Sequence, residues 1–506
     1  MQCAAVVRSG IGRDRALLGS AAAGHVRVSA VRDDCPVVSA TSRSTQRVIV
    51  VGGGIAGLVA AYDLAGNPDL DVLLLEAAPR VGGKLLASEI AGVRTDAGAE
   101  AFLVRDPAAV ELVMALGLEP DLVHPATSTA GIWVGGQAQP VPRGTVMGVP
   151  SRVDSLAPLL SAAGLRRALD GARGSYEPVR EDISIGALVA AQLGPEVVAR
   201  AVEPLLGGVY AGRADLLSLR STVPALWSAL HTDGSVVRAA AAAAPIPADG
   251  PPAPVFGTLR HGLCSLVVML VDMLPGLVRT GVTVRELDRT VDGFRLVTGP
   301  VPAPEVLHAD AVVLAVPAPP AARLLRDVAP AASVALGTVD YASTALVRLA
   351  YAPGTQLPAG SGLLVPADQG YVVKALTYSG QKWAHLADGP VLVRASVGRY
   401  GDVAVLQRDD DDLVALVAGE VAALTGVTAA PLDTDVTRWG GALPQYAVGH
   451  ADLVDRVRTS VADVPGLAVC GATYGGVGIP ACVRSGRAAA AQVASTLRAA
   501  RQSGHG

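Results

Sequence analysis

A glycine pattern near residue 50 has the residue types and spacing of a phosphate-binding turn. Gly52, Gly54 and Gly57 form Gly-x-Gly-x-x-Gly directly after the apolar run 47–51 and before a helical pattern over 55–64. Glycine permits the tight turn at the first position, close approach of a pyrophosphate at the second and helix–strand packing at the third. The amide groups that open the helix attract phosphate charge. The pattern therefore predicts a dinucleotide-binding turn.

An acidic residue follows at the distance that such a turn requires. The next apolar run, 71–76, ends in Glu76, which lies 19 residues beyond Gly57. Strand, helix and second strand make one unit of about 30 residues, which implies a parallel sheet. The Glu76 carboxylate can accept hydrogen bonds from ribose hydroxyls. An ordinary tight turn is the alternative, and the flanking strand, helix and acid favour the binding site.

A second glycine pair distinguishes between the two common dinucleotides. Gly82 and Gly83 precede Lys84, a few residues past the acid that binds ribose. Glycine lets a ligand approach the backbone closely, and the lysine can meet phosphate or flavin oxygens. This segment resembles the extended flavin signature of the amine-oxidase, porphyrinogen-oxidase and carotenoid-desaturase superfamily, whereas a nicotinamide dehydrogenase does not need it. The alternative is a loop with a solvated lysine.

Composition excludes several classes of protein. The 506 residues suggest two or three domains, and the formal net charge of −4 without a basic block argues against nucleic-acid binding. The 51% hydrophobic content comes mostly from Ala and Val, and no run reaches the roughly 20 apolar residues of a membrane-spanning helix. Five widely spaced cysteines and scattered histidines indicate no disulfide framework and no metal site. A reducing, cytoplasmic location is expected.

Six further blocks carry a resemblance to a known family. They are 96–103 (DAGAEAFL), 142–150 (PRGTVMGVP), 203–212 (EPLLGGVYAG), 373–379 (VKALTYS), 438–446 (RWGGALPQY) and 476–480 (GVGIP). With these blocks the chain resembles the bacterial coproporphyrinogen III oxidase/protoporphyrinogen oxidase family from Arg47 to Leu497.

The resemblance implies FAD as the cofactor and a set of residues that contact it. These are Gly52, Gly53, Gly54, Ile55, Ala56, Gly57, Glu76, Lys84, Gly98, Ala99, Glu100, Ala101, Val284, Trp439, Val477, Gly478 and Ile479. The closing glycine segment also has its own rationale, because amides at a helix start can hold the electron-rich edge of a flavin. Trp439 can equally be a core residue. Val284 is more often an ordinary sheet residue, and only the family match favours a flavin contact there.

The expected fold class is α/β, with a Rossmann-like FAD-binding domain interleaved with a mixed-sheet substrate domain and a helical subdomain. The expected boundaries are a disordered extension over 1–46, FAD-binding parts over 47–130, 251–320 and 441–506, a helical region with possible membrane contact over 131–250, and a substrate-binding domain over 321–440. Within the helical region we predict helices over 183–193 and 196–206, and a linker over 239–254.

The resemblance also implies a reaction. A porphyrinogen would lose six electrons in three flavin cycles, with O2 reoxidising the flavin to give H2O2. Because the cofactor carries the hard chemistry, no obligate catalytic base follows and the catalytic residues are unknown. The substrate carboxylates require cations, for which Arg105, Arg143, Lys374 and Lys382 are candidates, each with a solvated surface cation as the alternative. Some family members have an arginine where Thr129 and Ala130 stand here.

Coproporphyrinogen III is the preferred substrate and protoporphyrinogen IX the alternative. Rival classes are a flavin amine oxidase, a carotenoid desaturase and a non-enzymatic escort protein of this fold. Expected partners are the porphyrinogen, O2 and, by transient hand-off, the next enzyme of heme biosynthesis. Any membrane contact would be peripheral, at the inner face.

Overall fold

The computed structural model describes residues 45–244 and 254–503. The extension predicted over 1–46 lies almost entirely outside this range, and the first strand begins at Gln46.

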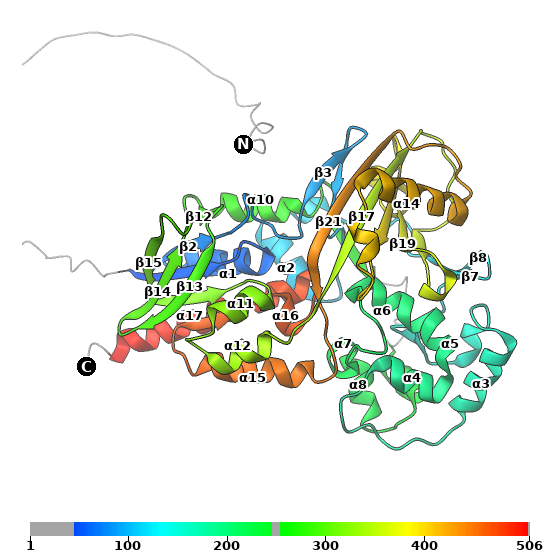
Figure 1. Cartoon of the computed structure of the whole chain (residues 1–506), viewed down its shortest axis with the longest axis horizontal. Helices are drawn as coiled ribbons and strands as arrows, with labels where there is room; N and C mark the ends of the chain where they lie inside the picture. Colours follow the sequence, from blue (N-terminus) through cyan, green and yellow to red (C-terminus); the bar gives the residue numbers. More distant parts are fainter. Residues whose placement is uncertain (1–44, 245–253, 504–506) are drawn as a thin grey trace, which may run out of the picture. The chain divides into compact units, whose positions relative to one another are not determined.

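A five-stranded parallel sheet forms the first layer of the fold (Figure 1). In order across the sheet, its strands are β12 (Val278–Arg279), β2 (Leu70–Leu75), β1 (Gln46–Val51), β16 (Ala311–Leu314) and β22 (Leu467–Val469). All four pairings are parallel, and the strands read as short, buried apolar runs because both faces are covered. The sequence segments of this sheet are separated by more than 200 residues in places.

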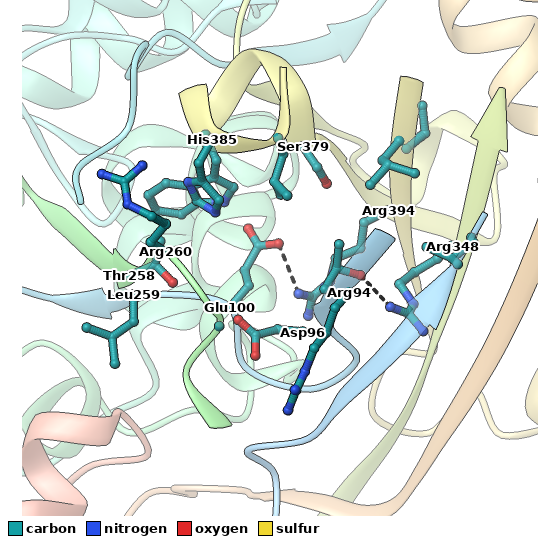
Figure 2. A pocket seen from close by; sticks show the side chains of 17 residues that line it. Arg94, Asp96, Glu100, Thr258, Leu259, Arg260, Arg348, Ser379, His385 and Arg394 are labelled. Carbon is teal, nitrogen blue, oxygen red and sulfur yellow. Dashed lines mark hydrogen bonds and ion pairs between the residues drawn. The ribbon is translucent and has the colours of Figure 1, made fainter. Parts of the chain in front are cut away.

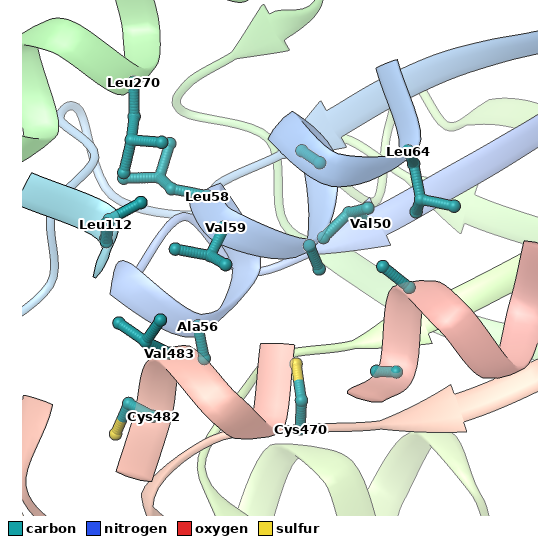
Figure 3. Close-up of a cluster of buried hydrophobic side chains, with 14 of the residues drawn as sticks. Val50, Ala56, Leu58, Val59, Leu64, Leu112, Leu270, Cys470, Cys482 and Val483 are labelled. Atoms are coloured by element: carbon teal, nitrogen blue, oxygen red, sulfur yellow. The ribbon is translucent and has the colours of Figure 1, made fainter. Parts of the chain in front are cut away.

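Alternate residues of β1 enter two different cores. Val48 and Val50 pack against α1 (Ile55–Ala65), α2 (Pro107–Ala115), α10 (Cys264–Asp272) and α17 (Ile479–Ser503). Figure 3 shows Ala56 of α1 beside Val483 of α17 in this core. Ile49 and Val51 face the opposite core, formed with α11 (Ala318–Leu324), α12 (Pro330–Leu336), α15 (His450–Ala462) and the antiparallel sheet β13 (Val284–Thr290), β14 (Gly293–Thr298) and β15 (Glu305–Ala309).

A seven-stranded mixed sheet forms the second unit. Its order is β21 (Asp433–Pro444), β17 (Tyr341–Tyr351), β20 (Val391–Val397), β19 (Val373–Tyr378), β18 (Gly362–Leu364), β7 (Gly131–Val134) and β8 (Gln137–Pro140). One face packs on α14 (Asp410–Thr425). The other face packs on the helical region beside β7 and on the hairpin β3 (Ala87–Ile90) and β4 (Val93–Asp96) beside β17 and β20. Between these two contacts, Ala375 and Ser396 belong to none of the apolar cores, and the buried Leu346 pairs with Ser396.

A helical region lies between β10 (Val149–Pro150) and β11 (Phe256–Leu259). Its main helices are α3 (Ala162–Ala172), α4 (Ile185–Leu193), α6 (Glu203–Tyr210), α7 (Leu219–Thr222), α8 (Pro224–Leu230) and α9 (Val236–Ala243). Together with the two sheets, this region confirms the predicted α/β architecture with a helical subdomain. No helix in the described ranges is both long and apolar enough to cross a membrane.

One local prediction in this region is confirmed and one is wrong. The helix expected over 196–206 lies within a continuous helical segment formed by α5 (Pro195–Val197), a π-helical turn (Val198–Val202) and α6. Pro204 has no N–H to donate to the preceding turn, which favours the π-helical turn at this point. The expected linker begins too early, because α9 continues to Ala243 with Ser235 as its cap. Alanine is the strongest helix former, and 245–253 lie outside the described residues.

Candidate active site

The first glycine turn lies at the carboxyl end of β1, where open α/β sheets bind ligands. Gly52 has a φ of +109°, and a Cβ there would lie 2.5 Å from the Ala315 carbonyl oxygen. A Cβ at Gly57 would lie 1.9 Å from the Gly52 carbonyl oxygen. Both positions therefore accept only glycine if strand, turn and helix are to pack as they do.

The start of α1 faces open space. No side chain caps this helix, no acidic residue lies in its first turn, and a Cβ at Gly54 would meet nothing within 4 Å. The Glu76 carboxylate, just past β2, accepts hydrogen bonds from the amides of Gly53 at 2.6 Å and Ala78 at 2.8 Å. Free amides at a helix start beside a fixed acid fit the pyrophosphate and ribose of a dinucleotide.

Three glycine loops between residues 52 and 101 form one continuous strip. The Gly82 amide donates to the Gly53 carbonyl at 2.7 Å, and the Ala99 amide donates to the Lys84 carbonyl at 3.0 Å. A Cβ at Gly98 would lie 1.9 Å from the same Lys84 oxygen. Burial lowers the pKa of Lys84, so a neighbouring anion would stabilise its charged form. The strip offers backbone along the length of an extended ligand.

The predicted closing segment directly precedes the last helix, which packs on α1. α16 (Ala472–Gly475) is followed by residues 476–478, and α17 begins at Ile479. The Tyr446 hydroxyl donates to the Ala472 carbonyl and accepts from the Gly476 amide at 2.9 Å. The Tyr446 ring lies 5.6 Å from that of Tyr210 in α6. The closing segment is thus tied to the helical region.

Of the two predicted contacts with alternative core roles, Trp439 lies beside the strip, whereas Val284 packs in a buried apolar core. The Trp439 indole of β21 donates to the Ala97 carbonyl at 3.1 Å, and a Cβ at Gly98 would lie 3.1 Å from its ring. Val284 begins β13 and is 9% exposed. It lies two residues past Val282, whose amide donates to the Glu76 carbonyl.

The four cationic candidates lie in different surroundings. Arg105 and Arg143 are exposed, whereas Lys374 is buried and its ammonium donates to the Gly398 carbonyl at 2.7 Å. The Lys382 ammonium forms an ion pair with Glu100 at 2.5 Å. The structure therefore gives two of the four candidates a partner within the chain.

A polar pocket lies behind the loop that carries Gly98 (Figure 2). Glu100 and Asp96 line it together with Arg94, Arg260 and Arg394. The ammonium of Lys382 and the guanidinium of Arg394 outweigh burial and lower the pKa of Glu100 to about 2. Burial raises the pKa of Asp96 to about 6, although the Leu263 amide donates to it. No pattern in the sequence pointed to Arg394.

Lys374 allows a prediction about pH. Burial, assisted by Arg399, lowers the pKa of Lys374 to about 7, far below that of an exposed lysine. The pKa of this lysine is lower in the folded protein than in the unfolded chain, so the folded state loses stability as the pH falls from the unfolded value to the folded value. Below the folded pKa, stability does not change further on account of this lysine. Methionine carries no such charge. As the pH falls from 10 to 7, we therefore expect the free energy of unfolding of Lys374→Met to rise relative to that of the parent by about 1.4 kcal/mol per pH unit.

Urea unfolding midpoints from pH 6 to pH 10 measure this difference. Parallel pH profiles for the two proteins would show that Lys374 does not titrate as its burial requires. A raised KM in Lys374→Met with an unchanged profile would instead support the predicted role as a substrate ligand.

The parallel sheet, the glycine strip and the second sheet together fit a flavin-dependent oxidoreductase. The family model for flavin containing amine oxidoreductase matches residues 55–494, and the chain belongs to this family. It is accordingly a flavoprotein, with FAD as the dinucleotide that the turn accommodates.

Individual proteins of known name resemble the chain over nearly its whole described length. A coproporphyrinogen III oxidase of Mycobacterium tuberculosis (strain ATCC 25618 / H37Rv) is 40% identical over 456 residues, covering 89% of this chain and 98% of the relative. One of Bacillus subtilis (strain 168) is 32% identical and covers 90% and 99%. The crystal structure of a putative protoporphyrinogen oxidase from Exiguobacterium sp. 255-15 has a TM-score of 0.80 at 32% identity, with 90% and 99% covered.

Proposed function

We propose that this chain oxidises coproporphyrinogen III to coproporphyrin III in heme biosynthesis, with FAD as cofactor and O2 as the final acceptor. The observation that carries the proposal is a group of small, half-buried side chains on the face of the second sheet opposite α14. We propose that the substrate lies in a slot between this face and the glycine strip. The names and the coverage of the relatives support the substrate class. The residues proposed to contact FAD are 52–57, Glu76, Lys84, 98–101, Val284, Trp439 and 477–479.

The proposed sheet wall contains several small side chains beside the buried Leu346, which pairs with Ser396. Ala375 pairs with Ser396 across β19 and β20, and neither belongs to an apolar core. They are half-buried, as is Thr377, while their strand neighbours pack into the core against α14. α6 lies against β18 and β19, and a Cβ at Gly208 in α6 would meet nothing within 4 Å. Such walls leave room for a flat macrocycle.

When bound, FAD supplies the hydride acceptor and passes the electrons to O2. The chain itself supplies position and a dry surface. Ala375, Thr377, Ser396 and Gly208, which form the proposed walls, offer no general base, and Glu100 is a weak one because its pKa is about 2. The pyrrole protons would therefore leave to solvent. The exposed Arg105 and Arg143 remain the proposed ligands of substrate carboxylates.

Gly208→Leu tests the slot directly. We expect kcat/KM for coproporphyrinogen III to fall at least tenfold, because the new side chain would enter the space proposed for the macrocycle. The fold should tolerate the change, since leucine replaces glycine in a helix where nothing lies close. Porphyrin fluorescence gives the rate, while bound flavin and the melting temperature report the fold.

Gly419→Leu, in α14 on the far side of the second sheet, is the matched control, since a Cβ there also meets nothing within 4 Å. Unchanged activity in Gly208→Leu would place the substrate elsewhere.

We propose in addition that the enzyme is cytoplasmic and contacts the inner face of the membrane peripherally. The porphyrin product would pass to the next enzyme of the heme pathway. Helix α3 supports such contact, since Arg166 and Arg167 are exposed on it and only Ala168 is buried. Arginines attract anionic headgroups. Co-sedimentation with anionic vesicles, compared with neutral ones, tests the contact, and equal recovery from both would oppose it.

A further inference from the structure

Three charged side chains meet behind the flavin loop. Glu100 lies just past β4, Lys382 ends α13 (Ser379–Lys382), and Arg394 lies in β20. One Glu100 oxygen lies 2.5 Å from the Lys382 ammonium and the other lies 3.0 Å from the Arg394 guanidinium. Their side chains are only 15% to 18% exposed. Charges at this depth are screened much less than surface pairs.

The cluster is bonded directly to the loop that contains Gly98. The other terminal nitrogen of Arg394 donates to the Gly98 carbonyl. Gly98 packs closely on the Lys84 carbonyl and the Trp439 ring, since an added Cβ would lie 1.9 Å and 3.1 Å from them. The cluster is therefore attached to the backbone that lines the proposed flavin site.

The cluster carries a net positive charge. Glu100 neutralises one of its two cations and leaves the other. Figure 2 shows Glu100 in the pocket between Arg260 and Arg348. Arg348 is paired with Asp435, whereas Asp96 adds a carboxylate and Arg94 and Arg260 add cations. Among these groups the cations remain in excess.

We propose that Lys382 and Glu100 are positioning residues that set the reduction potential of the flavin. Reduction adds negative charge to the ring, and a fixed cation behind a buried loop stabilises that charge. Lys382 supplies the excess cation, and Glu100 limits its effect while fixing the loop. This inference rests on the flavin site of the proposed function but not on its substrate.

Two substitutions should shift the potential in opposite directions. Lys382→Met leaves the neutral Glu100–Arg394 pair, and we expect the equilibrium for flavin reduction to become about tenfold less favourable, a shift of about −30 mV for a two-electron couple. Glu100→Gln leaves both cations uncompensated, and we expect a similar shift of opposite sign. A role in folding alone would not give opposite signs.

The measurement is a reductive titration of the purified yellow holoenzyme against a redox dye, at one pH and without porphyrinogen. Lys382→Arg should stay within twofold of the parent. Arg238→Met, which removes a cation from the distant Arg238–Asp233 pair, is the matched control and should also stay within twofold. Shifts of the same sign, or both below twofold, would overturn the proposal.

If Glu100→Gln does not retain flavin, the comparison of Lys382→Met with Lys382→Arg decides alone, and equal potentials would overturn the proposal. A colourless parent protein would instead refute the flavin site itself. A normal titration without turnover of coproporphyrinogen III would refute only the substrate.

Discussion

Replacing Gly54 by valine is expected to give a folded protein that binds FAD at least a hundredfold more weakly, a loss of about 3 kcal/mol or more. Gly54 has φ −70° and ψ 173°, which valine adopts readily. Within the chain its Cβ would meet nothing within 4 Å. The isopropyl group would therefore occupy only the space that the pyrophosphate needs. Flavin absorbance per protein and the melting temperature of the flavin-free form measure the two effects.

Gly57→Ala is the contrasting variant. Its Cβ would lie 1.9 Å from the Gly52 carbonyl oxygen, so strand, turn and helix would have to shift. We expect this variant to lose stability as well as flavin. A Gly54→Val protein as yellow as the parent would show that no pyrophosphate lies at the start of α1.

Arg348→Met is expected to destabilise the junction between the second sheet and the β3–β4 hairpin. Arg348 is 4% exposed, and its guanidinium contacts Asp435 at 2.7 Å and Thr95 at 2.5 Å, as well as Ser88. Removing one partner of a buried pair leaves the other uncompensated. Because Asp435 keeps some exposure, we expect the free energy of unfolding to fall by about 3 kcal/mol, the low end for such pairs.

Urea unfolding and hydrogen exchange of residues 87–96 measure this loss. The double variant Arg348→Met with Asp435→Leu should recover part of the stability, because it removes both charges. A single variant within 1 kcal/mol of the parent, with unchanged exchange in the hairpin, would contradict the assigned role.

The parts of the site formed by residues close in sequence could be predicted from the sequence. A Gly-x-Gly-x-x-Gly turn is defined by contacts within one βαβ unit, so its position and the role of Glu76 follow from spacing. The contact between the Gly82 loop and Gly53 is also short in sequence. Trp439 was identified only through the family resemblance, because it meets the Ala97 carbonyl across 342 residues.

The charged partners were not predictable. Lys382 and Lys374 were chosen by residue type, and nothing in their sequence neighbourhood indicates an ion pair with Glu100 or a bond to Gly398. The Arg394–Glu100 pair spans 294 residues. Such pairs depend on strand order in the second sheet, which hydrophobic periodicity does not specify. The alanine-rich end of α9 shows the same limit, since composition favours both helix and linker.

The most direct test is anaerobic mixing of the yellow enzyme with coproporphyrinogen III and, in parallel, with protoporphyrinogen IX, followed at the flavin absorbance band. We expect both substrates to bleach the flavin, and coproporphyrinogen III to bleach it faster. Coproporphyrin fluorescence should appear at the same rate as the bleaching by coproporphyrinogen III. Equal or slower bleaching by coproporphyrinogen III would contradict the substrate assignment, and no bleaching by either would contradict the proposed oxidase.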